Sequence, residues 1–252
     1  MKLHNLRLSF VIVEYHSIED IAICTSSIAI TFADFFEFEI IVSSNSMYST
    51  EQQSEITKRW DLLRWVFNEK NGGFAYAMNR GLAVANGDIL IILNPDVQIK
   101  FGFVDMVNYL GKCNNIGIIA PKLIDKDGKV QDSYRNFITP ISFLKRNLLR
   151  LLCGEREPIV PVSSVNVDWV IGAFMMMSRE SYEAVNGLDE NYFLYCEDMD
   201  LCRRMHLAGY SVVYYPEACG QYVGTRSARK SRKFAWIFLK SLFRYWNKFG
   251  IL

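Results

Sequence analysis

The stretch Ile89-Leu90-Ile91-Ile92-Leu93-Asn94-Pro95-Asp96 decides the fold class. An apolar run that ends at a proline predicts a short strand buried on both faces, as in parallel sheets, because proline cannot donate a hydrogen bond to a neighbouring strand. Asp96 follows at the carboxyl end of this strand, where ligands bind in open α/β sheets. A carboxylate there can hold a divalent cation that also binds the phosphates of a nucleotide. The alternative is that Asp96 is an ordinary turn residue.

Short apolar runs alternate with helical patterns before this strand, which is typical of βαβ units. We therefore expect an α/β fold with a Rossmann-like, mostly parallel central sheet flanked by helices. No internal repeat or flexible linker is present, so one continuous domain followed by a helical tail is expected. The expected strands are Leu8–Val13, Glu39–Ser43, Leu62–Phe67, Ile89–Leu93, Ile116–Ala120 and Val167–Ser178; the expected helices are Ser17–Phe32, Thr50–Arg59 and Ala75–Ala85, and Leu144–Ser164 is expected to form a helix and then a substrate-facing loop.

The composition excludes several classes of protein. With 252 residues, of which 50% are hydrophobic, the chain can bury a core of its own, which excludes a disordered or disulfide-dependent protein. The six cysteines show no metal-binding spacing, which favours a reduced, cytoplasmic setting. The apolar run that follows Lys2 and Arg7 is expected to be a buried strand and not a signal peptide. No uncharged apolar stretch is long enough to predict a membrane-spanning helix.

The formal net charge of +1 hides an uneven distribution. Residues 218–252 carry eight bases and no acid, so the rest of the chain has a net charge of −7. Residues 226–252 have the pattern of a basic amphipathic helix with tryptophan and tyrosine, which suits binding to the inner face of a membrane. The alternative is a terminal helix that packs on its own domain or across a homodimer. Nucleic-acid binding is disfavoured, because the rest of the chain is acidic and lacks a recognition motif.

A second cluster of acids is Glu197-Asp198-Met199-Asp200, ahead of a helical pattern. Near a helix N-terminus the macrodipole keeps a carboxylate ionised, so that it can accept a proton from a substrate hydroxyl as a general base. The alternative is that these acids are ordinary helix caps.

A third candidate is Asn71-Gly72-Gly73-Phe74, followed by Asn79-Arg80-Gly81 in the next helix. Glycines allow close approach of the backbone to a ligand, and a helix N-terminus favours phosphate. The Gly-x-Gly-x-x-Gly spacing of dinucleotide-binding dehydrogenases is absent, so an ordinary Rossmann dehydrogenase is disfavoured.

Taken together, these motifs resemble the family 2 glycosyltransferases, which are inverting enzymes of the GT-A fold, and especially the rhamnosyltransferase-like members that build bacterial surface polysaccharides. The resemblance covers nearly the whole chain. It rests on an ordered series of segments: residues 11–17, 41–46, 71–75, 79–81, 87–88, 93–97, 121–123, 127–128, 167–173, 187–193, 197–200 and 208–210.

The resemblance implies roles for individual residues. Asp96 would hold a divalent cation, Mn²⁺ or Mg²⁺, on the diphosphate of the donor, and Asp198 would be the general base, with Glu197 and Asp200 shaping its field or touching the acceptor. Residues 1–100 would form the half that binds the nucleotide sugar and residues 101–225 the half that binds the acceptor, followed by the helix 226–252. The implied donor-binding residues are Val13, Tyr15, Ser44, Asn71, Gly73, Asn79, Asn94 and Asp96; the implied acceptor-binding residues are Trp169, Gly172, Ala173 and Asp200.

Three positions depart from the family pattern. Glu14-Tyr15-His16 stands where Thr- or Ser-Tyr-Asn is common, and Ser44 stands where an acid commonly contacts the base of the donor. Tyr222 stands where a histidine often completes the metal site. Tyrosine is a poorer metal ligand at neutral pH, because the phenol has a pKa of about 10.

The resemblance implies an inverting, metal-dependent transfer of a sugar, with rhamnose as the favoured guess, from a nucleoside diphosphate to a saccharide acceptor that is lipid-linked. One alternative is a non-catalytic subunit that binds sugar or nucleotide within a polysaccharide assembly complex. A second is a nucleotidyltransferase, which is disfavoured because the glycine-rich, basic loop near the N-terminus is absent.

Overall fold

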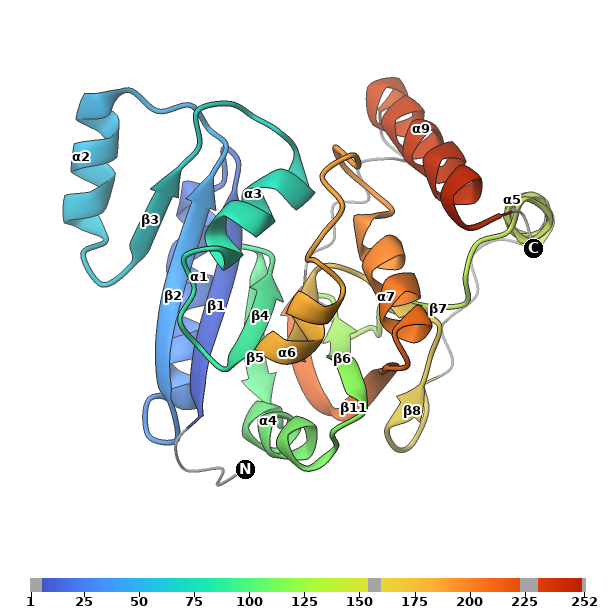
Figure 1. Cartoon of the computed structure of the whole chain (residues 1–252), viewed down its shortest axis with the longest axis horizontal. Helices are drawn as coiled ribbons and strands as arrows, with labels where there is room; N and C mark the ends of the chain where they lie inside the picture. The colour runs from blue at the N-terminus through green and yellow to red at the C-terminus, as the bar shows by residue number, and fades with distance from the viewer. Residues whose placement is uncertain (1–5, 154–159, 223–230, 251–252) are drawn as a thin grey trace.

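The structure is a computed structural model that describes residues 6–153, 160–222 and 231–250 (Figure 1). Its described part is built on a nine-stranded mixed sheet, in the order β3-β2-β1-β4-β10-β6-β11-β5, with β8 paired to β11. A small second sheet joins β7 and β9. The strands of the large sheet are β1 Arg7–Glu14, β2 Glu37–Ser44, β3 Arg64–Phe67, β4 Ile89–Leu93, β5 Val97–Phe101, β6 Ile116–Ile124, β8 Val165–Asn166, β10 Phe174–Ser178 and β11 Ser211–Tyr222; those of the small sheet are β7 Tyr134–Arg135 and β9 Trp169–Val170.

Helices cover both faces of the large sheet (Figure 1). Helices α1 and α4 pack on one face, and α3, α6 and α7 pack on the other. Each face buries its own apolar cluster, and β4, whose five residues are all buried, contributes to both. The helices are α1 Ile18–Phe32, α2 Thr50–Arg59, α3 Phe74–Leu82, α4 Phe103–Lys112, α5 Pro140–Cys153, α6 Arg179–Ala184, α7 Glu197–Leu207 and α9 Arg232–Phe249.

The order of the strands reverses beside β1. The chain runs outward from β1 through β2 to β3 and then returns to the other side of β1 as β4, with all four strands parallel. Ligands bind outside the carboxyl ends of strands at such a reversal. Strand β10 is antiparallel to β4 and pairs Phe174 with Leu93, so the start of β10 lies at this same edge. This edge is where the sequence placed Asp96.

The expected α/β architecture is confirmed, with some differences in detail. The sheet is parallel through β3-β2-β1-β4 and between β6 and β11, whereas β10 and β5 are antiparallel to their neighbours. The single strand expected over Val167–Ser178 is wrong, because the backbone N–H groups of Ile171 and Gly172 donate to Ser133 O and to the Asp198 side chain, which separates β9 from β10. Helix α5 begins at Pro140, four residues before the expected start, and proline is tolerated in the first turn of a helix.

Helix α9 packs against its own domain. Leu242 and Tyr245 are buried, the Ser241 hydroxyl donates to Leu194 O at 2.8 Å, and Lys248 forms an ion pair with Asp189. The expected tail helix therefore exists from residue 232, while the part expected over 226–230 lies outside the described residues. Among the residues described, no helix combines the length and the apolar character that crossing a membrane requires.

Candidate active site

The sheet edge at β4 brings Asp96, Asn94 and Tyr222 together. Asp96 directly precedes β5, and Val97 of β5 pairs with Tyr222, the last described residue of β11. Asn94 donates its backbone N–H to Ala173 O at 3.0 Å, and its side-chain amide donates to the Tyr222 hydroxyl at 3.4 Å. Three segments that are far apart in sequence thus meet around one carboxylate.

Among the residues that the structure describes, the charge of Asp96 has little compensation. Burial, with a smaller effect from Asp20, raises the pKa of Asp96 to about 6. Burial and the neighbouring Asp96 carboxylate raise the pKa of Tyr222 to about 12, so Tyr222 is a neutral phenol at neutral pH. A cation next to Asp96 would offset the cost of burying its charge. The site therefore has the electrostatic character of an incomplete cation-binding site.

Asp198 lies at the start of α7, facing the same edge. Tyr195 and Cys196 both adopt left-handed backbone conformations, with φ of 70° and 66°, which turn the chain sharply into the helix. The Asp198 carboxylate accepts hydrogen bonds from the backbone N–H groups of Met199 at 2.8 Å and Gly172 at 3.0 Å. These two bonds fix its orientation, and Asp198 lies close enough to Tyr222 to contribute to that phenol's raised pKa.

Burial raises the pKa values of Asp198 and Glu197. Glu197 is only 6% exposed, its Oε2 has no hydrogen-bond partner, and Asp198 raises its pKa further. Two buried neighbouring carboxylates do not both ionise readily, and the lack of a partner for Glu197 Oε2 disfavours the charged form of Glu197 more than that of Asp198. The two backbone donors and the Arg135 guanidinium favour the charged form of Asp198. Arg135 belongs to no sequence motif and was not predicted as a site residue; only its position near Asp198 identifies it.

Two predicted acceptor residues occupy structural positions. Asp200 is fully buried and forms ion pairs at 2.6 Å with both Arg204 and Lys248, so its expected contact with the acceptor has no support in this structure. Trp169 is 5% exposed and donates its indole N–H to Asn136 O at 2.9 Å. Its ring is therefore packed inside the protein and offers no exposed face on which a sugar could stack. Gly172 and Ala173, in contrast, lie directly beside Asp198 and Asn94.

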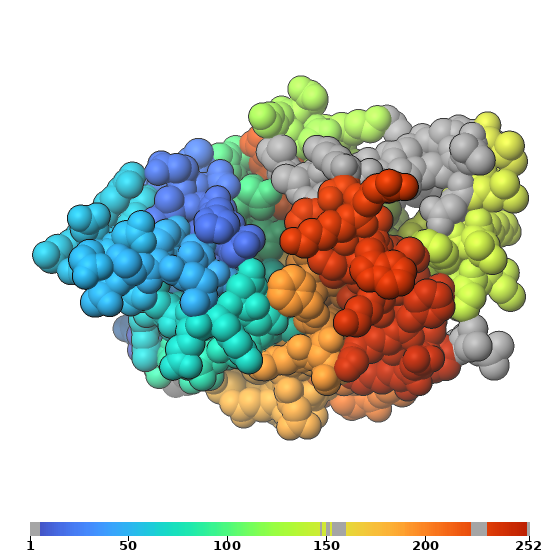
Figure 2. Space-filling model, turned by 90° about the horizontal axis from the view of Figure 1, so that it is seen from above, coloured from blue at the N-terminus to red at the C-terminus, as the bar shows by residue number. Residues whose placement is uncertain are grey.

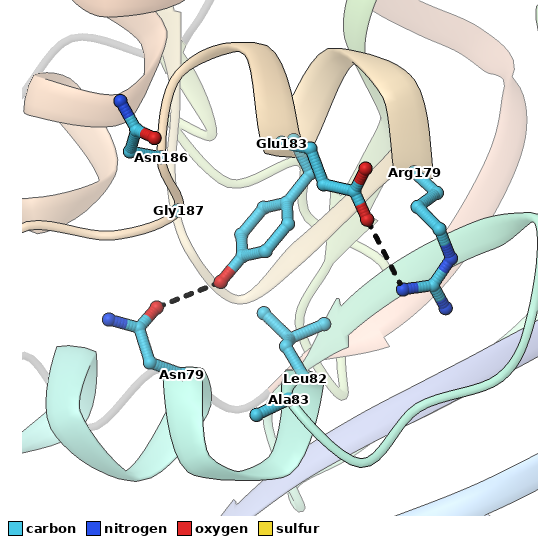
Figure 3. Close-up of a pocket in the computed structure, with 8 residues that line it drawn as sticks. Asn79, Leu82, Ala83, Arg179, Glu183, Asn186 and Gly187 are labelled. Carbon is cyan, nitrogen blue, oxygen red and sulfur yellow. Dashed lines mark hydrogen bonds and ion pairs between the residues drawn. The ribbon is translucent and has the colours of Figure 1, made fainter.

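Asn79, expected near the donor, binds α6 and the segment that follows it instead. Its side-chain oxygen accepts from Tyr182 Oη at 2.8 Å and Leu188 N at 3.1 Å, and its amide donates to Leu188 O and the Glu190 carboxylate, both at 2.9 Å. Every hydrogen-bonding position of Asn79 is thereby used within the protein. Figure 3 shows that Asn79 borders a pocket between α3 and α6, together with Arg179 and Glu183.

The carboxyl ends of β1 and β2 hold a second polar cluster, centred on Glu14. Glu14 is fully buried and lies opposite Ser44 in the strand register. Its carboxylate accepts hydrogen bonds from the hydroxyls of Ser44, Ser46 and Tyr48 and from the backbone N–H of Ser17. The acid that β2 lacks at Ser44 is therefore present on the neighbouring strand. From the sequence alone, Glu14 is only a departure from the family pattern.

The remaining donor-site predictions lie around this cluster. Val13 is 9% exposed, Ser44 is 1% exposed, and Tyr15 is 54% exposed, so of these three only Tyr15 offers a broad open surface. Asn71 accepts from the Gly73 N–H at 3.1 Å and from Asn45 at 3.3 Å. A side chain at Gly73 would meet Phe193 O at 2.1 Å, so this glycine is needed for close contact with the segment that leads into α7.

Comparison with known proteins identifies the family. The model of glycosyl transferase family 2 matches residues 9–185, and a model described as the N-terminal domain of galactosyltransferase matches residues 164–227. The chain is 27% identical over 235 residues to rhamnosyltransferase WbbL of Escherichia coli, covering 87% of this chain and 86% of WbbL. It is 28% identical over 200 residues to the N-acetylglucosaminyl-diphospho-decaprenol L-rhamnosyltransferase of Mycobacterium tuberculosis, covering 71% of this chain and 64% of that protein.

Solved structures confirm the fold. GalNAc-T7, solved with UDP, GalNAc and Mn²⁺, superimposes with a TM-score of 0.69 at 16% identity and covers 96% of this chain and 48% of that one. The mannosyltransferase PcManGT of Pyrobaculum calidifontis, solved with GDP-Man and Mn²⁺, gives a TM-score of 0.65 at 20% identity and covers 98% of this chain and 65% of that one. From its matching family model and its fold, the chain belongs to glycosyl transferase family 2 and is a glycosyltransferase of the GT-A fold that is similar to rhamnosyltransferases.

Proposed function

We propose that this glycosyltransferase moves rhamnose from a thymidine diphosphate donor to a lipid-linked saccharide, with inversion at the anomeric carbon. The observation that carries the proposal is the meeting of Asp96 and Asp198 around Tyr222, at the carboxyl edge of the parallel strands. One carboxylate is suited to the charged end of a donor, and the other is suited to a proton transfer. The names of relatives support the sugar and the acceptor: one is the dTDP-rhamnosyl transferase RfbF of Shigella flexneri, and another acts on a diphospho-decaprenol carrier.

Asp198 acts as the general base. Its carboxylate takes the proton of the acceptor hydroxyl while that oxygen forms a bond to the anomeric carbon and the bond to the diphosphate oxygen breaks on the opposite face. Attack from the face opposite the leaving group inverts the configuration. The N–H groups of Gly172 and Met199 hold the carboxylate for this transfer. Glu197 keeps its proton because of its burial, and Arg135 favours the ionised state of Asp198.

Asp96 would hold a cation against the donor diphosphate, with the Tyr222 phenol beside it. Among the described residues no three His, Cys, Asp or Glu side chains form a group that could hold a metal. Asp96 is the residue that would hold a divalent cation at the donor diphosphate. The partly buried Asp96, with its raised pKa, fits that arrangement. When bound, Mn²⁺ or Mg²⁺ stabilises the negative charge on the departing diphosphate. Tyr222 keeps its proton and can donate a hydrogen bond to the same group.

Residues 1–100 form the donor half and residues 101–225 the acceptor half in this proposal. The exposed ring of Tyr15 and the loop that Glu14 holds border the nucleotide, with Val13, Ser44, Asn71 and Gly73 supporting it from within. Gly172 and Ala173 border the acceptor. We place the enzyme at the cytoplasmic face of a membrane, where a lipid-linked acceptor is accessible.

A panel of nucleotide sugars tests the proposal. Each donor is incubated with Mn²⁺, Mg²⁺ or a chelator, and slow hydrolysis to free sugar and nucleoside diphosphate is followed by NMR. We expect metal-dependent hydrolysis of thymidine diphosphate rhamnose that disappears in Asp96→Ala. Hydrolysis of a different donor would overturn the choice of sugar. Donor binding without turnover, unchanged in Asp198→Asn, would favour the alternative of a non-catalytic binding subunit.

A further inference from the structure

The sequence suggested that the apolar face of α9 would contact a membrane, but a different side of this helix faces outward. Its broad apolar face, with Leu242 and Tyr245, is buried against the domain. The side that remains exposed carries Trp236, 70% exposed, and Phe243, 60% exposed. Lys240 lies between them in sequence and is also exposed, as are Arg232 and Lys233 in the first turn. The exposed side of α9 thus presents bases and two aromatic rings, and it has no continuous apolar face of its own.

A continuous apolar face is present on the neighbouring helix α5. Ile141, Leu144, Leu148 and Leu152 are 79%, 69%, 57% and 70% exposed. Their spacing of three or four residues places them along one side of the helix, and Leu149 widens it. An uncovered row of large apolar side chains is a typical feature of an interaction surface.

The two helices form one unit. The Phe143 ring packs 6.2 Å from the rings of both Phe238 and Trp246, and the Trp246 indole donates to Ile138 O at 2.7 Å. Seen from above, α9 in red and α5 in yellow-green lie on the same side of the molecule (Figure 2). In Figure 1 the parallel strands β1, β2 and β4 point toward the top of the molecule, where α9 lies, and α5 lies next to α9 at the right-hand edge.

The charge of this unit identifies its partner. Residues 140–153 and 231–250 contain eight bases and no acid. Lys248 is paired with Asp189 and Asp200 inside the domain, whereas five of the other bases are exposed: Lys145, Arg232, Lys233, Lys240 and Arg244. A second copy of the chain would place the same bases against one another in a two-fold contact, which repulsion disfavours. An anionic bilayer satisfies both features, because its headgroups attract the bases and its acyl chains accept the apolar face.

We propose that α5 and α9 together form a docking surface for an anionic lipid bilayer, in which α5 inserts its apolar face and α9 supplies bases and interfacial aromatic rings. The proposed lipid-linked acceptor gives this surface its use. The surface itself stands on the exposure and charge of the two helices. Docked in this way, the protein directs the edge that carries Asp96 and Asp198 toward the bilayer region that holds a lipid-linked acceptor.

Vesicle binding tests the surface without donor or acceptor. Full-length protein is sedimented with vesicles of phosphatidylcholine alone and of phosphatidylcholine mixed with phosphatidylglycerol, at low and high salt. We expect binding to the anionic vesicles to be at least about tenfold tighter and to weaken with salt. Leu144→Glu/Leu148→Glu in α5 and Lys233→Glu/Lys240→Glu in α9 are each expected to reduce it about tenfold or more. The matched control, Ile30→Glu/Leu62→Glu, changes two residues that are 85% and 92% exposed outside this surface, and is expected to bind as the unchanged protein does.

Several outcomes would overturn the docking surface. These are absence of binding to anionic vesicles, equal loss in the control variant, and a dimer in light scattering that the α5 variant converts to monomer. Circular dichroism and donor hydrolysis in vesicle-free buffer verify that the variants remain folded. Vesicle binding as expected, together with no hydrolysis of any donor, would retain the surface and reject the proposed function.

Discussion

Carboxylates at two places along the same carboxyl edge of the sheet lie in opposite environments. At the ends of β1 and β2, Glu14 is fully buried but accepts four hydrogen bonds from neighbouring hydroxyl and backbone groups. At the β4 edge, Asp96 has a pKa raised to about 6, and Glu197 has a buried oxygen without a partner. This difference indicates that Glu14 has a structural role, whereas the carboxylates at the end of β4 and the start of α7 are suited to binding a ligand or a cation. Four substitutions test this contrast.

The largest effect is expected for Asp198→Asn. The amide cannot take the proton of the acceptor, so we expect kcat to fall about 10³-fold, equivalent to about 4 kcal/mol, while nucleoside diphosphate binding is retained. Steady-state kinetics and calorimetric titration measure the two quantities. Unchanged kcat would remove Asp198 from the mechanism, and loss of nucleotide binding would show that the substitution damages the donor site.

Lys248→Met is expected to reduce stability most. It removes one of the two cations that pair with the fully buried Asp200, and we expect the free energy of unfolding to fall by about 3 kcal/mol. Urea denaturation measures this value. Lys240→Met, on the exposed side of the same helix, is the control and is expected to change stability by less than about 0.5 kcal/mol. Equal effects of the two substitutions would contradict the anchoring of α9 through Asp200.

Glu14→Gln replaces a carboxylate oxygen by a donor inside a cluster of donors. The Gln oxygen can still accept from the Ser17 N–H, but its amide group then faces the Ser44 hydroxyl, and the negative charge that strengthens all four hydrogen bonds is lost. We therefore expect a loss of about 2 kcal/mol in unfolding free energy and weaker nucleotide binding. Glu19→Gln is the control, because the Glu19 side chain is 81% exposed. A Glu14→Gln protein as stable as the control would refute the structural role of this cluster. The double variant Glu14→Ser/Ser44→Asp moves the acid from β1 to its register partner on β2. We expect this double variant to be more stable than the single variant Glu14→Ser.

Asp96→Asn is expected to act in the opposite direction. The folded protein raises the pKa of Asp96 from 3.8 to about 6, so ionised Asp96 destabilises the fold above about pH 6, and this penalty disappears as the pH falls through about 6 toward 3.8. In chelator we therefore expect Asp96→Asn to be about 1 kcal/mol more stable above pH 6 and no more stable near pH 4. Urea denaturation at both pH values measures this, with the exposed Asp34→Asn as control. A destabilised Asp96→Asn protein would contradict the uncompensated charge at this edge.

The sequence predicted what depends on local pattern. The buried run Ile89–Leu93, and the alternation of apolar runs with helical patterns before it, predicted the βαβ half. The predicted end of this strand and the predicted start of α7 located Asp96 and Asp198 along the chain. It did not predict contacts between distant segments. Asp200 pairs with Lys248, 48 residues away, and Asn79 binds Leu188, 109 residues away. Such partners decide whether a polar side chain supports the fold or stays open to a ligand, and periodicity carries no information about them.

The break in the chain before β10 and the burial of α9 also depend on contacts between distant segments, which the local sequence pattern does not predict. The run 167–178 has the composition of a strand, but the hydrogen bond from Gly172 to Asp198 that interrupts it depends on the position of α7. The apolar residues of α9 fitted a membrane and a protein core equally well. Only the contact of Leu242 and Tyr245 with the rest of the domain separates the two.

We expect Asp96, at the end of β4, to bind a divalent cation together with the nucleotide. Calorimetric titration of thymidine diphosphate, in Mn²⁺ and in chelator, tests this expectation directly. The unchanged protein is expected to bind the nucleotide at least about tenfold more tightly in Mn²⁺, and Asp96→Asn is expected to lose this difference while it remains folded. Equal affinity in Mn²⁺ and chelator for the unchanged protein, or a metal dependence that survives in Asp96→Asn, would contradict the account.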